Sequence, residues 1–103
     1  MITLANAKTH LRVDHSHEDD LIQIYIDAAL KRFEHFTGRK LYEDQDALDA
    51  DADAPEFTQV MEMPIKAGCL LLIGHLFMHR DEDAPTPRAI NDLWQPYRVI
   101  RVG

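Results

Sequence analysis

Two helix starts follow each other closely at the beginning of the chain, and they leave this part little freedom in how it folds. Thr3 is a good N-cap for a short helix over Leu4–Leu11, because its hydroxyl can accept a hydrogen bond from a backbone N–H two or three residues on. A second start is expected at Asp14 or Ser16, since acidic residues fill the turn that follows, where the helix dipole favours them. The sequence therefore predicts two helices joined by a tight connection.

The second helix is predicted to be long and to end at Gly38, which can take the left-handed conformation that terminates a helix. Its apolar residues recur at intervals of three and four and form one stripe of Leu21, Ile22, Tyr25, Ile26, Ala29, Phe33 and Phe36. The opposite side carries the mixed set Gln23, Asp27, Lys31 and Glu34. That side lacks the basic stripe of a helix that recognises nucleic acid.

Residues 41–62 are predicted to form a long acidic loop between the second and third helices. The segment Asp44–Pro55 is rich in Asp and Ala and has too few apolar residues to cover a core. Short extended pieces are expected at Lys40–Tyr42 and Thr58–Glu62. Loops longer than about 15 residues are unusual in compact domains and tend to be functional or disordered.

Pro64 marks the start of a third helix, because the N–H that proline lacks would be unpaired in a first turn. The run from Ala67 to Gly74 is apolar around its whole circumference, which predicts a helix buried on most sides. Gly68 and Gly74 each weaken a helix by up to about 1 kcal/mol relative to alanine, which favours a close approach of another backbone. The remaining apolar face is expected to meet a neighbouring subunit. This subunit interface is predicted to contain Leu4, Leu11, Gly68, Leu71 and Gly74.

The C-terminal part is predicted to be a short helix over Arg88–Gln95, stopped by Pro96, and then an extended arm over residues 96–103. The arm is locally basic within an acidic chain, which is typical of a segment that docks on an acidic surface. Tyr and Arg are also enriched at interface hot spots. The partner interface is expected to contain Trp94, Pro96, Tyr97, Arg98, Val99 and Ile100. An alternative stays open, in which Trp94 and Tyr97 close the core of the monomer and Arg98 lies in water.

The size and charge of the chain limit what it can do. Its 103 residues fit a single domain over residues 1–103 with one hydrophobic core. A formal net charge of −7 argues against tight binding to DNA phosphates, which requires an excess of Lys and Arg. The single cysteine, Cys69, fits a reducing cytoplasm and is expected to be inert core. We expect neither a membrane span nor a secretory signal.

Three clusters could bind metal, and each has a simpler explanation. His75 and His79 have the spacing of a helical metal pair, but Leu76 stands where a zinc protease needs glutamate. A second set near a helix start consists of His10, His15 and His17. A third set, which begins like a calcium loop but lacks its glycine and its bidentate glutamate, consists of Asp49, Asp51 and Asp53. We therefore expect no metal, no cofactor and no catalytic site.

Several blocks, in order along nearly the whole chain, carry a resemblance to a known family. They are Met1–Asp14, Leu21-Ile22, Tyr25-Ile26, Ala28-Ala29, Thr37-Gly38-Arg39, Pro64–Ala67, Leu70–His75 and Pro96–Val99. In this order and spacing they resemble the head–tail connector (adaptor) proteins of long-tailed bacteriophages. The resemblance implies an all-α fold, a small bundle of three to four helices, and no enzyme activity.

The resemblance also implies a structural role in a phage or prophage. Such a protein forms a ring of about twelve subunits below the portal and joins the DNA-filled head to a head-completion or tail protein. DNA passes through the ring without sequence-specific binding. The protein is then expected in the virion, at the head–tail junction, after assembly in the host cytoplasm. The alternatives are a small helical regulatory or nucleic-acid-associated protein and, third, a metal-dependent enzyme that uses the histidines.

Overall fold

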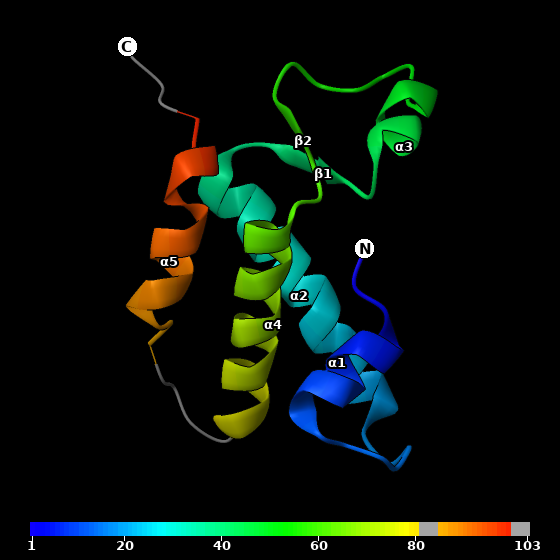
Figure 1. Cartoon of the computed structure of the whole chain (residues 1–103), viewed down its shortest axis with the longest axis vertical. Coiled ribbons are helices and arrows are strands. Elements are labelled where there is room, and N and C mark those ends of the chain that lie inside the picture. The colour runs from blue at the N-terminus through cyan, green and yellow to red at the C-terminus, as the bar shows by residue number, and fades with distance from the viewer. Residues whose placement is uncertain (81–84, 100–103) are drawn as a thin grey trace.

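The computed structural model describes residues 1–80 and 85–99, and this part of the chain is predominantly helical (Figure 1). In chain order the elements are α1 (Leu4–Leu11), α2 (Asp19–Thr37), β1 (Lys40–Tyr42), α3 (Gln45–Ala50), β2 (Thr58–Val60), α4 (Met63–Met78), α5 (Arg88–Trp94) and the 3-10 turn η1 (Gln95–Tyr97). The predicted all-α class is confirmed, although a small strand pair accompanies the helices.

Helix α1 begins as predicted. The Thr3 hydroxyl accepts from the Asn6 backbone N–H at 3.0 Å, and the Asn6 side chain accepts from the Thr3 N–H at 3.2 Å. The two bonds satisfy backbone donors that have no partner within the helix. Arg12 then ends α1 in the left-handed conformation, with φ of 59°.

Helix α2 also ends as predicted, at Gly38 with φ of 77°. The predicted caps Asp14 and Ser16 are wrong, because the N-cap is Glu18 and it makes no side-chain capping bond. One acidic residue of the first turn serves a different purpose, since Asp19 lies 2.8 Å from the Lys8 ammonium of α1. An ion pair between the two helices thus forms in the first turn of α2.

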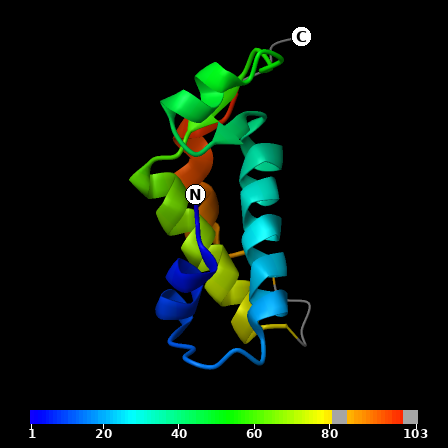
Figure 2. The same ribbon diagram turned by 90° about the vertical axis from the view of Figure 1, so that its right-hand side faces the viewer.

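Helix α4 runs through the centre of the bundle and packs against α1, α2 and α5 (Figure 1). Figure 2 shows α2 along one side of the molecule and α1 with α4 along the other. The buried side of α4 consists of Ile65, Gly68, Cys69, Leu72 and Ile73. Helix α5 covers a face of α4 that α1 and α2 leave open. Leu71 and Met78 of α4 stay exposed.

Trp94 of α5 fills the space above Gly68 of α4. The indole is fully buried, and its Nε1 donates to the Ile65 carbonyl at 3.4 Å. Its ring also meets the edge of Phe33, with the ring centroids 5.4 Å apart. A Cβ atom on Gly68 would lie 2.2 Å from the indole Nε1, so the close approach predicted at this glycine is made by an aromatic ring of the same chain. Gly68 and Trp94 therefore belong to the core of the monomer.

The segment predicted as one long loop contains two short strands and a helix. Strand β1 lies where the first extended piece was expected, whereas β2 is shorter than the predicted Thr58–Glu62. The two strands pair in parallel, with Lys40 opposite Thr58 and Tyr42 opposite Val60. Helix α3 lies between them and was not predicted. Its N-cap is Asp44, whose carboxylate accepts from the Ala47 N–H at 2.8 Å.

The two helical glycines of α4 should respond oppositely to alanine. We expect Gly68→Ala to lower the free energy of unfolding by about 1–3 kcal/mol, because the new methyl group collides with the Trp94 ring. Gly74→Ala is the matched control. Its Cβ atom would lie 3.5 Å from the His10 ring, an ordinary contact, so the helix gains up to about 1 kcal/mol.

Urea unfolding of both variants, followed by far-ultraviolet circular dichroism, measures these differences. Equal stability of the two variants would contradict the packing of Trp94 on Gly68.

Candidate functional site

An apolar groove lies between α1 and the C-terminal half of α4. It has a volume of about 400 Å³, and its lining residues are His10, Leu11, Leu71, Gly74, His75, Phe77, Met78 and His79. Leu71 is 45% exposed and Met78 is 75% exposed, so two large apolar side chains at this groove remain in contact with water. We call this surface the α1–α4 groove.

Three of the residues predicted at a subunit interface meet in this groove, namely Leu11, Leu71 and Gly74. Leu4 does not line it, because the side chain is half-buried and packs against the core. Gly68 lies beneath Trp94, as described above. The structure thus brings together the part of the predicted interface that is nearest the C-terminal end of α4.

Two histidines at the groove lie close together. The rings of His75 and His79 have centroids 4.7 Å apart. Within residues 1–80 and 85–99, no group of three or more His, Cys, Asp or Glu side chains is arranged to hold a metal ion. Cys69 is buried, and burial raises the pKa of its thiol to about 12, which suits an unreactive core residue.

The C-terminal arm is docked on the end of α2 as far as the structure describes it. The Val99 N–H donates to the Thr37 carbonyl at 2.8 Å, and the Arg39 guanidinium donates to the Tyr97 carbonyl at 2.7 Å. The same guanidinium donates to the Thr58 carbonyl of β2 at 3.2 Å. Arg39 therefore ties the arm, β2 and the end of α2 together.

Tyr97 is only partly available to a partner. Its hydroxyl donates to Glu62 at 2.9 Å, and burial, followed by this contact, raises the pKa of the phenol above its ordinary value. The Arg98 guanidinium lies 5.5 Å from the centre of the Phe36 ring, while Pro96 is exposed. Ile100, also predicted at this interface, lies outside the described residues. In the alternative that the sequence left open, Trp94 and Tyr97 close the core of the monomer and Arg98 lies in water. The structure places Trp94 in the core and leaves Arg98 exposed.

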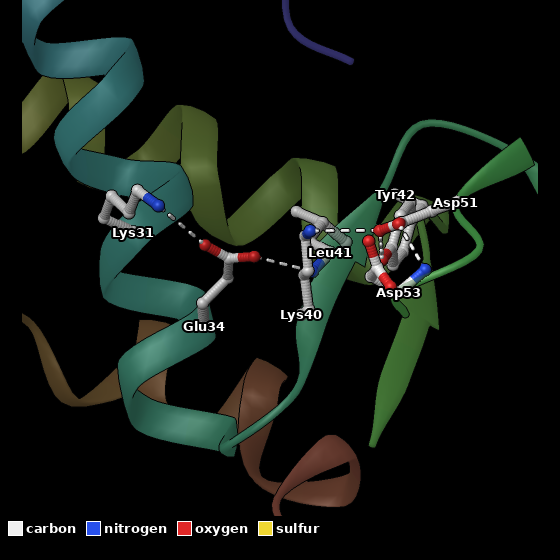
Figure 3. Close-up of polar contacts among 7 residues, drawn as sticks. All are labelled: Lys31, Glu34, Lys40, Leu41, Tyr42, Asp51 and Asp53. Carbon is white, nitrogen blue, oxygen red and sulfur yellow. Dashed lines mark hydrogen bonds and ion pairs between the residues drawn. The ribbon is translucent and has the colours of Figure 1, made fainter. Parts of the chain in front are cut away.

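The acidic segment between β1 and β2 is held to β1 by one carboxylate (Figure 3). Asp51 accepts from the Tyr42 hydroxyl at 2.5 Å and from the Lys40 ammonium at 3.2 Å. The Tyr42 bond, the Asp53 backbone N–H and Lys40 together lower the pKa of Asp51 below its ordinary value of 3.8. Asp51 thus anchors α3, and the calcium loop that its spacing suggested does not form around it.

Sequence reasoning missed α3 because it weighed the low apolar content of the segment more than its local signals. Asp44 is a strong N-cap residue, and Ala47, Leu48 and Ala50 favour a helix. Those signals would have predicted a short helix at this place.

Removing the Tyr42 hydroxyl should change how this anchor responds to acid. Because the pKa of Asp51 is depressed in the folded state, the stability it contributes is present above its unfolded pKa and is lost as the pH falls through its folded pKa. Tyr42→Phe should raise the pKa of Asp51, so that α3 detaches from β1 at a higher pH. Carboxyl-detected NMR titration measures this shift, and an unchanged pKa would contradict the anchor. Tyr25→Phe, which removes a hydroxyl from α2, is the control.

None of the helices in the described ranges is long and apolar enough to cross a membrane. No curated protein matches the chain in a sequence search. The fold is similar to that of a solved structure, the crystal structure of bacteriophage HK97 gp6, with a TM-score of 0.65 and 19% sequence identity. That likeness covers 95% of this chain and 93% of the other and shows a shared fold.

A comparison with protein families matches residues 1–82 to the family described as phage gp6-like head–tail connector protein. The match includes α1, α2 and α4, which contribute to the core, and among them the two helices that line the α1–α4 groove. The chain therefore belongs to the gp6-like head–tail connector family of phages, and its role is that of a structural connector in the virion.

Proposed function

We propose that this chain acts as one unit over residues 1–103 and assembles into a closed ring of about twelve subunits below the portal. The observation that carries the proposal is the α1–α4 groove, with Leu71 and Met78 exposed at its edge. Identical chains that close into a ring use two different surfaces, one on each side of every subunit. The groove supplies one of these surfaces.

Energetic considerations favour an occupied groove. Covering a large apolar side chain contributes about 1.5–3 kcal/mol relative to leaving it exposed. In the monomer, Leu71 and Met78 have not gained a large part of this free energy, because both are exposed beside an apolar hollow. A neighbouring subunit that fills the groove would recover it, and several equivalent contacts around a ring would add up.

The charge of the chain suits a channel through which DNA moves. A net charge of −7 gives the phosphates no tight attachment, so DNA would pass through the ring without sequence-specific binding. The outer side of α2 lacks the basic stripe of a recognition helix. Its Gln23 amide instead donates to the acidic Asp27 at 3.1 Å. No observation supports the regulatory alternative.

The partners in this proposal are the portal on one side of the ring and a head-completion or tail protein on the other. The exposed residues of the docked arm, Pro96 and Arg98, are suited to one of these contacts. Assembly would take place in the cytoplasm of a host that carries the phage or prophage. The role is structural throughout, and it needs no catalytic group.

A charge placed at the groove should prevent assembly without unfolding the chain. We expect Leu71→Glu to abolish ring formation, because a carboxylate at a covered apolar position must lose its hydration. Ile24→Glu is the matched control, since Ile24 is also a large exposed apolar residue, 60% exposed, on the outside of α2. Light scattering over a concentration series measures the mass of both variants and of the parent chain.

The same proteins, mixed with the portal protein of the same phage, test the role itself. The parent chain and Ile24→Glu should bind the portal as a ring. A parent chain that stays monomeric and ignores the portal at high concentration would contradict the proposal, as would normal rings from Leu71→Glu.

A further inference from the structure

A second hollow lies at the C-terminal end of α2 and is basic. It has a volume of about 450 Å³ and is lined by Lys31, Glu34, His35, Gly38, Arg39 and Lys40. The helix dipole favours cations at this end of a helix, which explains their position. We call this surface the basic hollow.

The positive charges of the basic hollow are only partly matched inside the monomer. Glu34 is the one carboxylate of the lining, and it accepts from the Leu41 backbone N–H at 2.7 Å and from Lys31 at 3.4 Å (Figure 3). The two carbonyls that hold Arg39 are uncharged. Lys31 is 84% exposed and His35 is exposed, so both can reach a further acidic group.

The chain carries an acidic surface on α3 and on the residues that flank it. We call this the acidic segment, and its exposed carboxylates are Glu43, Asp44, Asp46, Asp49, Asp53 and Glu56. Asp49 accepts from the Gln45 amide at 2.8 Å, which leaves its negative charge unmatched. The Lys40 ammonium forms its ion pair with Asp51, which is half-buried and is not one of these exposed carboxylates. The acidic segment therefore presents several carboxylates to the outside.

The two surfaces point in different directions at the same end of the molecule, and the Lys40–Asp51 ion pair lies between them. Figures 1 and 2 agree that α3 projects on one side and the C-terminal end of α2 lies on the other. A chain that meets its own copies through two different surfaces needs such an arrangement. Electrostatic complementarity of this kind sets orientation and register more than affinity.

We propose that the acidic segment of one copy of this chain docks in the basic hollow of the next. The inference rests on the proposed ring and names the second contact of each subunit. Apolar burial at the α1–α4 groove supplies affinity, while the charged contact fixes the angle between neighbours. Because both charged surfaces are exposed, the contact weakens as salt rises.

Charge reversal on each side, separately and together, tests this contact. Lys31→Glu with His35→Glu reverses the basic hollow, and Asp49→Lys with Asp53→Lys reverses the acidic segment. Each pair alone should raise the concentration at which the chain assembles by about tenfold or more. All four changes in one chain should restore assembly to within about threefold, because the reversed surfaces again attract each other.

The control matched to the acidic-segment pair, Asp14→Lys with Asp27→Lys, makes the same change of charge at exposed positions outside both surfaces. It should assemble like the parent chain. Circular dichroism of every variant confirms that it is folded, and light scattering at low and high salt measures assembly.

The contact is overturned if the reversed chains assemble like the parent, if the fourfold variant fails to recover, or if the parent chain stays monomeric. A duplex DNA probe that binds the parent chain but not Lys31→Glu with His35→Glu would assign the basic hollow to nucleic acid instead. Capture by the portal is measured in parallel. A parent chain that binds the portal but ignores the charge reversals keeps its connector role and loses only this contact.

Discussion

The rest of the structure depends on the packing of Trp94 against Gly68. Only a glycine lets the indole come so close to α4, and the indole in turn meets Phe33 of α2. One side chain therefore joins the last helix to the two longest ones. Together with the buried Ile90, this contact anchors α5, and the arm that follows is held at the end of α2 by Thr37 and Arg39.

Two outer surfaces follow from this core. Because α5 and α2 cover much of α4, Leu71 and Met78 are left exposed on its C-terminal half, next to α1. At the other end, Arg39 holds the arm and β2 through their carbonyl oxygens and remains a cation. The α1–α4 groove and the basic hollow thus lie at different ends of the helical bundle, so each can take part in a different contact.

Local chemistry made much of the fold predictable. Thr3, Gly38 and Pro64 act within their own helix, through a side-chain cap, a left-handed backbone conformation and a missing N–H, so the sequence identifies one end each of α1, α2 and α4 without tertiary information. The apolar stripe of α2 predicted its buried residues for the same reason. The start of α2 was predicted wrongly because its N-cap, Glu18, makes no side-chain capping bond that the sequence could signal.

Contacts between distant residues were beyond the sequence argument. The parallel pairing of β1 with β2 joins residues 18 positions apart, such as Lys40 and Thr58, and no periodicity signals it. Gly68 and Gly74 look alike in sequence, yet one faces Trp94 and the other borders the groove. The predicted interface residues were therefore divided between the core and the surface only by the tertiary structure.

In the proposed ring, a neighbouring subunit covers the α1–α4 groove. Electron cryomicroscopy of the chain assembled with its portal tests this most directly, because it shows what lies against each residue. We expect a closed ring in which side chains of the adjacent subunit cover Leu71 and Met78. A ring in which both residues face solvent, or a portal that carries isolated subunits, would contradict it.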